Sequence, residues 1–141
     1  MNILILGAGL MQKPAILSAK ELGFTVCVID ANDKAVAIPY AHKFKKIDLK
    51  DKEGILEYAK ELQIEQNGGL AGVFTAGTDF SASVSFVCQK LSLPSHSFEA
   101  ATNASVKTQM RQCFKTHNVP SPDFFSVSKE QIQSESQINQ L

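Results

Sequence analysis

Short aliphatic runs alternate with segments of helical periodicity from the first residues of the chain to about Leu91. Residues 2–6 form a continuous apolar run followed by glycine, which is typical of a strand covered on both faces. Regular alternation of strand and helix indicates right-handed βαβ units, whose strands lie parallel in one sheet. The chain is therefore predicted to be an α/β protein with a Rossmann-like, doubly wound parallel sheet.

The individual elements follow from apolar periodicity and from breaker residues. Strands are predicted at residues 2–6, 25–29, 44–47, 71–75 and 124–127. Helices are predicted at residues 11–22, 51–64, 80–91, 98–101 and 105–117, and Thr78 or Asp79 is expected to cap the helix at 80–91. In the helix at 105–117, the residues expected to face the core are Val106, Met110, Cys113, Phe114 and His117. A last helix is predicted to open with a capping box at Ser128, and the polar tail that follows is expected to be frayed.

Composition and charge disfavour several classes of protein. The 141 residues carry 14 basic and 14 acidic side chains, so the formal net charge is zero and no general attraction for nucleic acid is expected. The first apolar run is too short for a membrane span or a signal core, which predicts no membrane association and a cytoplasmic location. The 3 cysteines and 3 histidines are scattered without ligand spacing. No metal site is therefore predicted, and the cysteines are interpreted as small buried apolar residues.

A ligand site is expected beyond the carboxyl ends of the strands, where the strand order of an open parallel sheet reverses. Three predicted loops lie at these ends and should converge on one edge. The candidate substrate-binding residues in them are Gly7, Gly9, Leu10, Met11, Gln12, Asp30, Gly77, Thr78, Asp79 and Phe80. No nucleophile–base pair, paired carboxylate or Walker-type lysine accompanies them, so no catalytic residue is assigned.

Each of these features also has a structural interpretation. The glycine loop offers free N–H groups to an anion, but a tight strand-to-helix turn needs glycine as well. Asp30 follows Gly9 by about 20 residues, the separation at which dinucleotide folds place an acid on ribose; alternatively, Asp30 accepts hydrogen bonds from neighbouring loop amides. Gln12 stands where such folds have a third small residue, so it is expected to crowd the helix or to project into the pyrophosphate site. Lys107 and Arg111 share one helix face, which either binds phosphate or is solvated.

Several motifs occur together in an order that resembles a known family. They are ILGAGLMQKPAI (5–16), AKELGFTVCVID (19–30), KKID (45–48), TAGTDF (75–80), KLSLPS (90–95) and SVKTQMRQCFKTHNVPSPDF (105–124). Over about residues 2–127 the chain resembles the N-terminal portion of ATP-grasp ligases. This group includes biotin carboxylase, the carbamoyl-phosphate synthase large subunit and purine-biosynthetic carboxylate ligases. In this family the continuation Gln12-x-Pro14, which is unusual in a dinucleotide fold, is expected.

The resemblance implies a Rossmann-like, pre-ATP-grasp domain at residues 1–103, followed at 104–141 by the start of an ATP-grasp domain. It implies that the loops at 7–12 and 77–80 face a carboxylate or amine substrate, and that Lys107 reaches the phosphates of ATP. The full enzymes use ATP and Mg²⁺ to activate a carboxylate, and the family's glycine-rich lid and metal ligands would lie beyond Leu141. The chain is thus expected to be either a fragment of a longer protein or a naturally truncated relative, inactive alone and without a tightly bound cofactor. Its expected partners are the missing catalytic region, a separate catalytic chain or, in a homodimer, a second copy.

Three positions depart from the family pattern, and two alternative functions remain. The family usually has Asp where Val106 stands, often has Asp in place of His42, and usually has Gly in place of Ser92. One alternative is a stand-alone NAD- or nucleotide-binding Rossmann module. The other is a non-catalytic interaction subunit, which would expose an apolar patch near residues 120–127.

Overall fold

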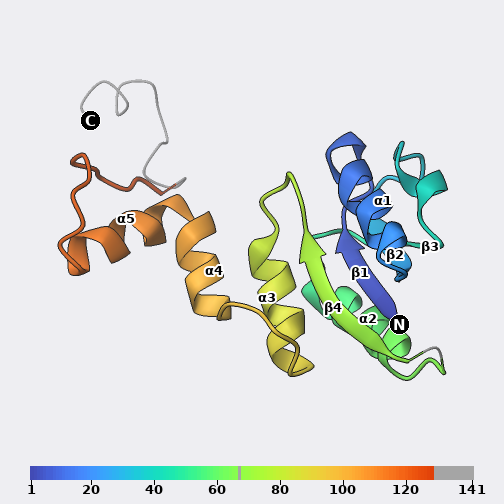
Figure 1. Ribbon diagram of the computed structural model, residues 1–141. Helices are drawn as coiled ribbons and strands as arrows, with labels where there is room; N and C mark the ends of the chain where they lie inside the picture. Colours follow the sequence, from blue (N-terminus) through green and yellow to red (C-terminus); the bar gives the residue numbers. More distant parts are fainter. Residues whose placement is uncertain (67, 129–141) are drawn as a thin grey trace.

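The computed structural model describes residues 1–66 and 68–128. At its centre is a four-stranded sheet in the order β3-β2-β1-β4, in which every neighbouring pair is parallel. The strands are β1 (Asn2–Leu6), β2 (Thr25–Asp30), β3 (Lys43–Lys46) and β4 (Leu70–Thr75). Their carboxyl ends lie at one edge of the sheet (Figure 1). The predicted α/β fold with a parallel sheet is confirmed.

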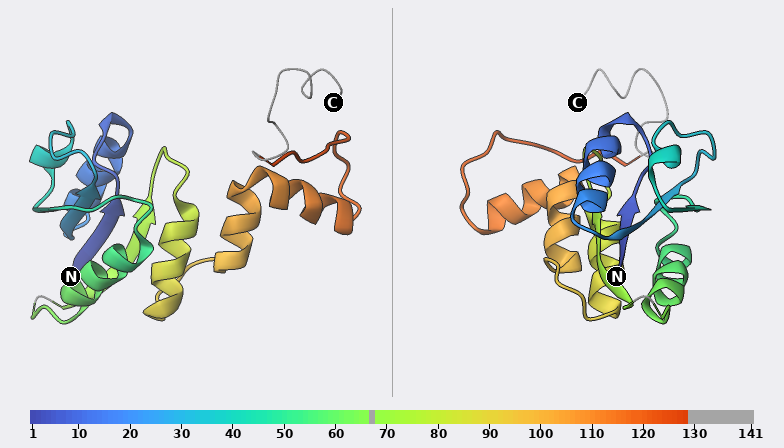
Figure 2. Two further views of the ribbon diagram at one scale, coloured as in Figure 1. Left: turned by 180° about the vertical axis from the view of Figure 1, so that it is seen from behind. Right: turned by 45° about the vertical axis from the view of Figure 1, so that its right-hand side comes forward.

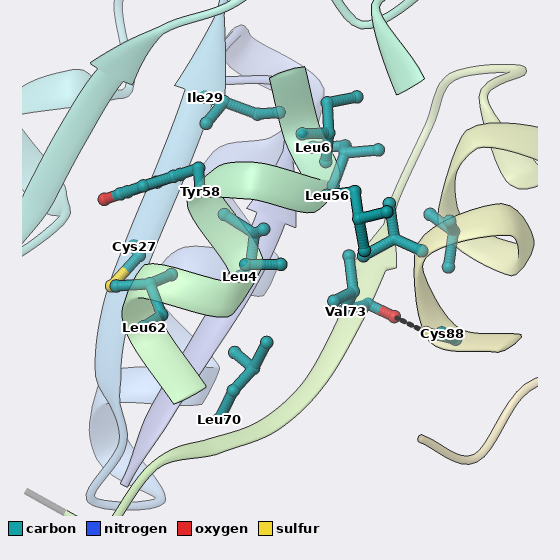
Figure 3. Close-up of a cluster of buried hydrophobic side chains, with 14 of the residues drawn as sticks. Leu4, Leu6, Cys27, Ile29, Leu56, Tyr58, Leu62, Leu70, Val73 and Cys88 are labelled. Atoms are coloured by element: carbon teal, nitrogen blue, oxygen red, sulfur yellow. Dashed lines mark hydrogen bonds between the residues drawn. The ribbon is translucent and has the colours of Figure 1, made fainter. Parts of the chain in front are cut away.

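Helices cover both faces of the sheet, as a doubly wound fold requires. On one face, α1 (Lys13–Glu21) and the 3-10 turn η2 (Ile38–Tyr40) pack over a core that includes Ile16. On the other face, α2 (Lys52–Gln63) and α3 (Ser81–Lys90) cover a larger core that includes Leu56 and Cys88 (Figure 3). The chain crosses from β1 to β2 over the first face and from β3 to β4 over the second. The direction of crossover therefore reverses between β1 and β4.

Local sequence explains where these helices begin. A short 3-10 turn, η1 (Leu10–Gln12), leads into α1, and Pro14 lies in the first turn of α1, where no backbone N–H is needed. Asp51 caps α2 by accepting a hydrogen bond from the Gly54 amide at 3.0 Å. At α3 the predicted cap is wrong. Phe80 occupies the cap position without a side-chain hydrogen bond, so Thr78 and Asp79 stay in the loop that precedes the helix.

Beyond α3 the chain leaves the sheet and forms α4 (Phe98–Ser105) and α5 (Lys107–Thr116). Both helices extend away from the sheet on the far side of α3 (Figures 1 and 2). α4 runs past the predicted end at residue 101 and packs on α3 through the rings of Phe86 and Phe98, whose centroids are 5.9 Å apart. Val106, in extended conformation, separates α4 from α5. A domain division near residue 104 stays a prediction.

The predicted burial of one face of α5 is wrong, because none of the residues of this helix is buried in the described structure. Val106 is 41% exposed, His117 is exposed, and Met110, Cys113 and Phe114 are only half-buried. The apolar periodicity does mark an amphipathic helix. However, its apolar side is only partly covered, because α4 packs against α5 but leaves a pocket beside Met110, Cys113 and Phe114.

The strand predicted at 124–127 is also wrong, because the described residues that follow α5 form no regular structure. They lie beyond α5, away from the sheet edge with which a strand would have to pair (Figure 1). The last predicted helix and the polar tail fall largely in residues 129–141, outside the described part of the chain. Within residues 1–66 and 68–128, every helix is too short or too polar to cross a lipid bilayer.

Candidate functional site

Three loops meet at the carboxyl edge of the sheet, and we call them together the rim: residues 7–12 after β1, 30–32 at the end of β2, and 76–80 after β4. The Ala8 amide donates to Asp30 Oδ2 at 2.9 Å, which joins the first loop to the second. The Gln12 side chain donates to the Ala76 carbonyl, which joins the first loop to the third. The convergence expected from parallel strands is therefore present, with the first loop in the middle.

Both carboxylate oxygens of Asp30 are engaged within the rim. Oδ2 accepts from the Ala8 amide and Oδ1 accepts from the Asn32 amide, each at 2.9 Å. The sequence allowed Asp30 either to bind a ribose or to accept hydrogen bonds from loop amides. The structure shows the hydrogen bonds to loop amides. Asp30 holds the turn after β1 against the turn after β2, so a ribose would have to compete with these two backbone donors.

Of the two positions expected for Gln12, the side chain takes the one at the glycine loop, where a dinucleotide fold would admit pyrophosphate, rather than crowding α1. The side chain folds back beneath the glycine loop and is only 6% exposed. Its Oε1 accepts from the Gly9 amide at 3.0 Å, and its Nε2 donates to the Ala76 carbonyl. The side chain therefore fills the space between the ends of β1 and β4 with both its donor and its acceptor satisfied.

The outer surface of the rim combines apolar and acidic side chains. Leu10 and Met11 are 70% and 67% exposed, and Asp79 is exposed on the neighbouring loop. Gly77 has a φ of +64°, and a Cβ built on it would lie 2.8 Å from Met11 Cβ. Only glycine fits there, because both the left-handed backbone and the close approach of Met11 exclude a side chain. Thr78 and Phe80 are half-buried beside it.

The start of α5 lies on the same side of the molecule as the rim. The hydroxyls of Ser81, at the start of α3, and Ser105, at the end of α4, are 3.0 Å apart. Lys107 follows two residues later and is exposed, and Arg111 is half-buried one turn further along α5. The sequence predicted the shared face of Lys107 and Arg111. It did not predict the contact between the two serines or the hydrogen bond that Gln12 donates to the Ala76 carbonyl. Neither carries a sequence signal, because each depends on which elements become neighbours in the fold.

The cysteines take no part in the rim. Cys27 and Cys88 are buried as predicted, whereas Cys113 on the uncovered helix α5 is only half-buried. Burial raises the pKa of the Cys27 thiol to about 11 and also raises the pKa of Cys88, so neither is a thiolate near neutral pH. Among the described residues, no group of three or more His, Cys, Asp or Glu side chains could hold a metal ion.

Two hollows of the described surface lie along α5. A pocket of about 260 Å³ is lined mostly by apolar side chains of α4 and α5, among them Met110, Cys113 and Phe114. A more polar hollow of about 360 Å³ lies between the end of α5 and residues 118–124. These hollows follow from the uncovered side of α5. We place the candidate site at the rim, where the crossover reverses, because loops from three strands meet there.

No protein-family profile matches the chain, but individual proteins do. A formate-dependent phosphoribosylglycinamide formyltransferase from Methanococcus maripaludis is 36% identical over 56 residues, which are 40% of this chain and 14% of that protein. Phosphoribosylglycinamide synthetase from Anaerococcus prevotii superposes on 99% of the chain with a TM-score of 0.76 and 26% identity. This chain has the fold of the N-terminal domain of ATP-grasp ligases.

A second ATP-grasp ligase has the same fold at lower sequence identity. N5-carboxyaminoimidazole synthetase from Staphylococcus aureus, solved in complex with ADP, matches 99% of the chain with a TM-score of 0.70 and 17% identity. The chain covers 34% of each of these two ligases. The resemblance inferred from the motifs is confirmed for the part of the ATP-grasp enzymes that this chain represents.

Proposed function

We propose that this chain is the N-terminal, substrate-binding domain of an ATP-grasp ligase that joins a carboxylate to an amine or a related nucleophile, and that it does not catalyse ligation alone. The observation that carries the proposal is the match of almost the whole chain to about one third of a phosphoribosylglycinamide synthetase. A substrate-binding role agrees with the position of the rim, where the crossover reverses and three loops are held together by hydrogen bonds.

The rim is proposed to contact the non-nucleotide substrate. Its accessible groups are the side chains of Leu10 and Met11, the carboxylate of Asp79 and the backbone of Gly77. An exposed carboxylate beside exposed apolar side chains suits a small amine better than a phosphate, since like charges repel. The amides of Ala8 and Gly9 already bond to Asp30 and Gln12, so they contribute little to binding an anion.

ATP and Mg²⁺ are proposed for the complete enzyme, in which ATP would supply the phosphoryl group. The described residues do not fit a Mg²⁺ site, because no cluster of metal-ligating side chains is present among them. Lys107 and Arg111 are two cations on one face of α5, so together they could bind at most one phosphate group. Lys107 is therefore proposed to contact a phosphate of a nucleotide that is held mainly by residues outside this chain. A cytoplasmic location stays a prediction from the sequence.

The test is a titration of ¹⁵N-labelled chain, followed by NMR, with a panel of small amines and carboxylates. We expect at least one panel member to shift the amides of loops 7–12 and 77–80, while Mg-ATP leaves these loops unchanged. Asp79→Asn should weaken the binding of an amine, and Glu99→Gln, on the exposed surface of α4, is the matched control. Shifts confined to α5, or an unresponsive rim, would contradict a substrate-binding role. Shifts of the rim by NADH alone would favour the stand-alone nucleotide module.

The uncovered side of α5 favours one alternative, an interaction subunit. Phe125 is 68% exposed and Phe124 is half-buried in the segment beyond that helix. Sedimentation of the wild-type chain and of the variants Phe124→Ser and Phe125→Ser separates the two functions. We expect the proposed domain to remain monomeric in all three forms. Self-association that is lost in the serine variants would favour the interaction subunit.

A further inference from the structure

The two glycines of the first loop make room for a protein side chain. A Cβ built on Gly7 would lie 3.1 Å from Gln12 Cδ, and one built on Gly9 would lie 3.1 Å from Gln12 Oε1. In dinucleotide folds the corresponding glycines admit a pyrophosphate, and a small third residue lets the helix pack closely. In this chain Gln12 occupies the third position, and its side chain packs against both glycines. We infer that Gln12 is a positioning residue that couples the loops after β1 and β4 and closes the glycine loop to phosphate groups.

Among side chains of this length in their usual charge state near neutral pH, only the amide of glutamine can make both observed contacts. The oxygen accepts from the Gly9 amide at 3.0 Å while the nitrogen donates to the Ala76 carbonyl. Methionine would fill a similar volume but would leave that donor and that acceptor without a partner. Ionised glutamate would keep the bond from Gly9 but would direct a carboxylate at the Ala76 carbonyl. The hydrogen-bonding pattern of Gln12, rather than its volume, therefore links the two loops.

The hydrogen bonds of Gln12 fix the position of the loop at 76–80 relative to the loop at 7–12. Ala76 directly precedes Gly77, and Gly77 contacts the Met11 side chain. The loop at 76–80 is thus attached to the first loop at two successive residues, through Gln12 and through Met11. The consequence for the ligand rests on the proposed function: the substrate would meet a preformed outer rim, because the space between the strand ends is already filled.

The experiment compares backbone order parameters, measured by ¹⁵N relaxation, in the wild-type chain with those in Gln12→Met and Gln12→Glu. The matched control is Gln109→Met, which changes an exposed glutamine on α5. In Gln12→Met we expect the order parameters of Gly77, Thr78 and Asp79 to fall relative to the control, because the loop loses its hydrogen bond to the first loop. Order parameters at these residues that match the control would overturn the coupling, even if that of Gly9 falls.

Gln12→Glu provides a test that does not depend on the methionine variant being folded. When protonated, its carboxyl group has one donor and one acceptor, as glutamine does, and this match is lost when it ionises. We therefore expect the backbone order parameters of residues 77–79 to be near wild type at low pH and to fall as pH rises. Order parameters that do not change with pH relative to wild type would overturn the inference.

Titration with inorganic pyrophosphate tests the closed loop. The wild-type amides of Gly7, Ala8 and Gly9 should not shift, whereas shifts are expected in Gln12→Gly, which restores a Gly-x-Gly-x-x-Gly sequence. Shifts in the wild type, or none in a folded Gln12→Gly variant, would contradict closure by Gln12. These results are independent of the amine and carboxylate titrations, so failure of the proposed function would leave them interpretable.

Discussion

Replacing Asp30 tests whether this acid is a structural tie between two loops. Its two oxygens accept from the Ala8 and Asn32 amides at 2.9 Å, and Ala8 is fully buried. Asn at position 30 has a single oxygen, which is expected to remain on the buried Ala8 amide, while water serves the exposed Asn32 amide. Ala at position 30 leaves the Ala8 amide without an acceptor.

The magnitudes follow from these contacts. A hydrogen bond to a charged group contributes about 1.5–3 kcal/mol, and a buried unsatisfied donor costs about 1–3 kcal/mol. We expect Asp30→Asn to lower the free energy of unfolding by about 1.5 kcal/mol and Asp30→Ala by about 3 kcal/mol. Urea denaturation followed by circular dichroism measures both, with an unchanged m-value showing that only stability has changed.

Asp33 provides the matched control. It lies in the same loop, but its carboxylate pairs with Lys46 at 2.8 Å, where both side chains are more than half exposed. Asp33→Asn and Asp33→Ala should therefore leave the urea midpoint almost unchanged, as is usual for a surface ion pair. If the Asp30 and Asp33 variants lose equal stability, or if Asp30→Ala is no less stable than Asp30→Asn, the loops are not held together by Asp30.

Three further changes test other features of the fold. Ser92 has a φ of 54°, a conformation that favours glycine, so Ser92→Gly should stabilise the chain by about 0.5 kcal/mol in urea denaturation; a loss of stability would refute backbone strain there. The Cys27 thiol ionises at about pH 9 when unfolded and at about 11 when folded, so the unfolded chain releases its proton first as pH rises. Its contribution of up to about 3 kcal/mol should be complete below pH 9 and lost towards pH 11, and Cys27→Ala should flatten this decline in a pH series of denaturation curves. His42 Nδ1 accepts from the buried Val26 amide at 2.9 Å, so His42→Phe should cost about 1 kcal/mol and His42→Asn less; equal losses would show that the acceptor is unimportant.

Much of the fold could be predicted because its signals are local. The strands β1, β2 and β4 match the predicted runs to within a residue, since buried parallel strands are mostly apolar and end at turn residues. The edge strand β3, which is rich in lysine and not buried, begins one residue before its predicted run. Their parallel pairing followed from strand–helix alternation, and that pairing brings the three loops to one edge. The rim could therefore be located from the sequence before its contacts were known.

The failures occurred where the outcome depended on non-local neighbours. The apolar stripe of α5 indicates a side that favours burial, but periodicity does not specify which element covers it. Residues 124–127 have strand-like composition but lie away from any sheet edge. Thr78 and Asp79 were suitable caps by residue type, yet the loop continues past both before α3 begins.

Gln12 and Asp30 mark the boundary between the two kinds of information. The sequence alone determined that a glutamine replaces the third glycine and that an acid ends the second strand, and it determined a parallel sheet that brings their loops together. Only the tertiary structure decided that both side chains turn inward and bond to backbone groups of neighbouring loops. The physical reason is that apolar periodicity is a property of one segment, whereas a polar side chain takes the orientation in which donors and acceptors from other segments satisfy it.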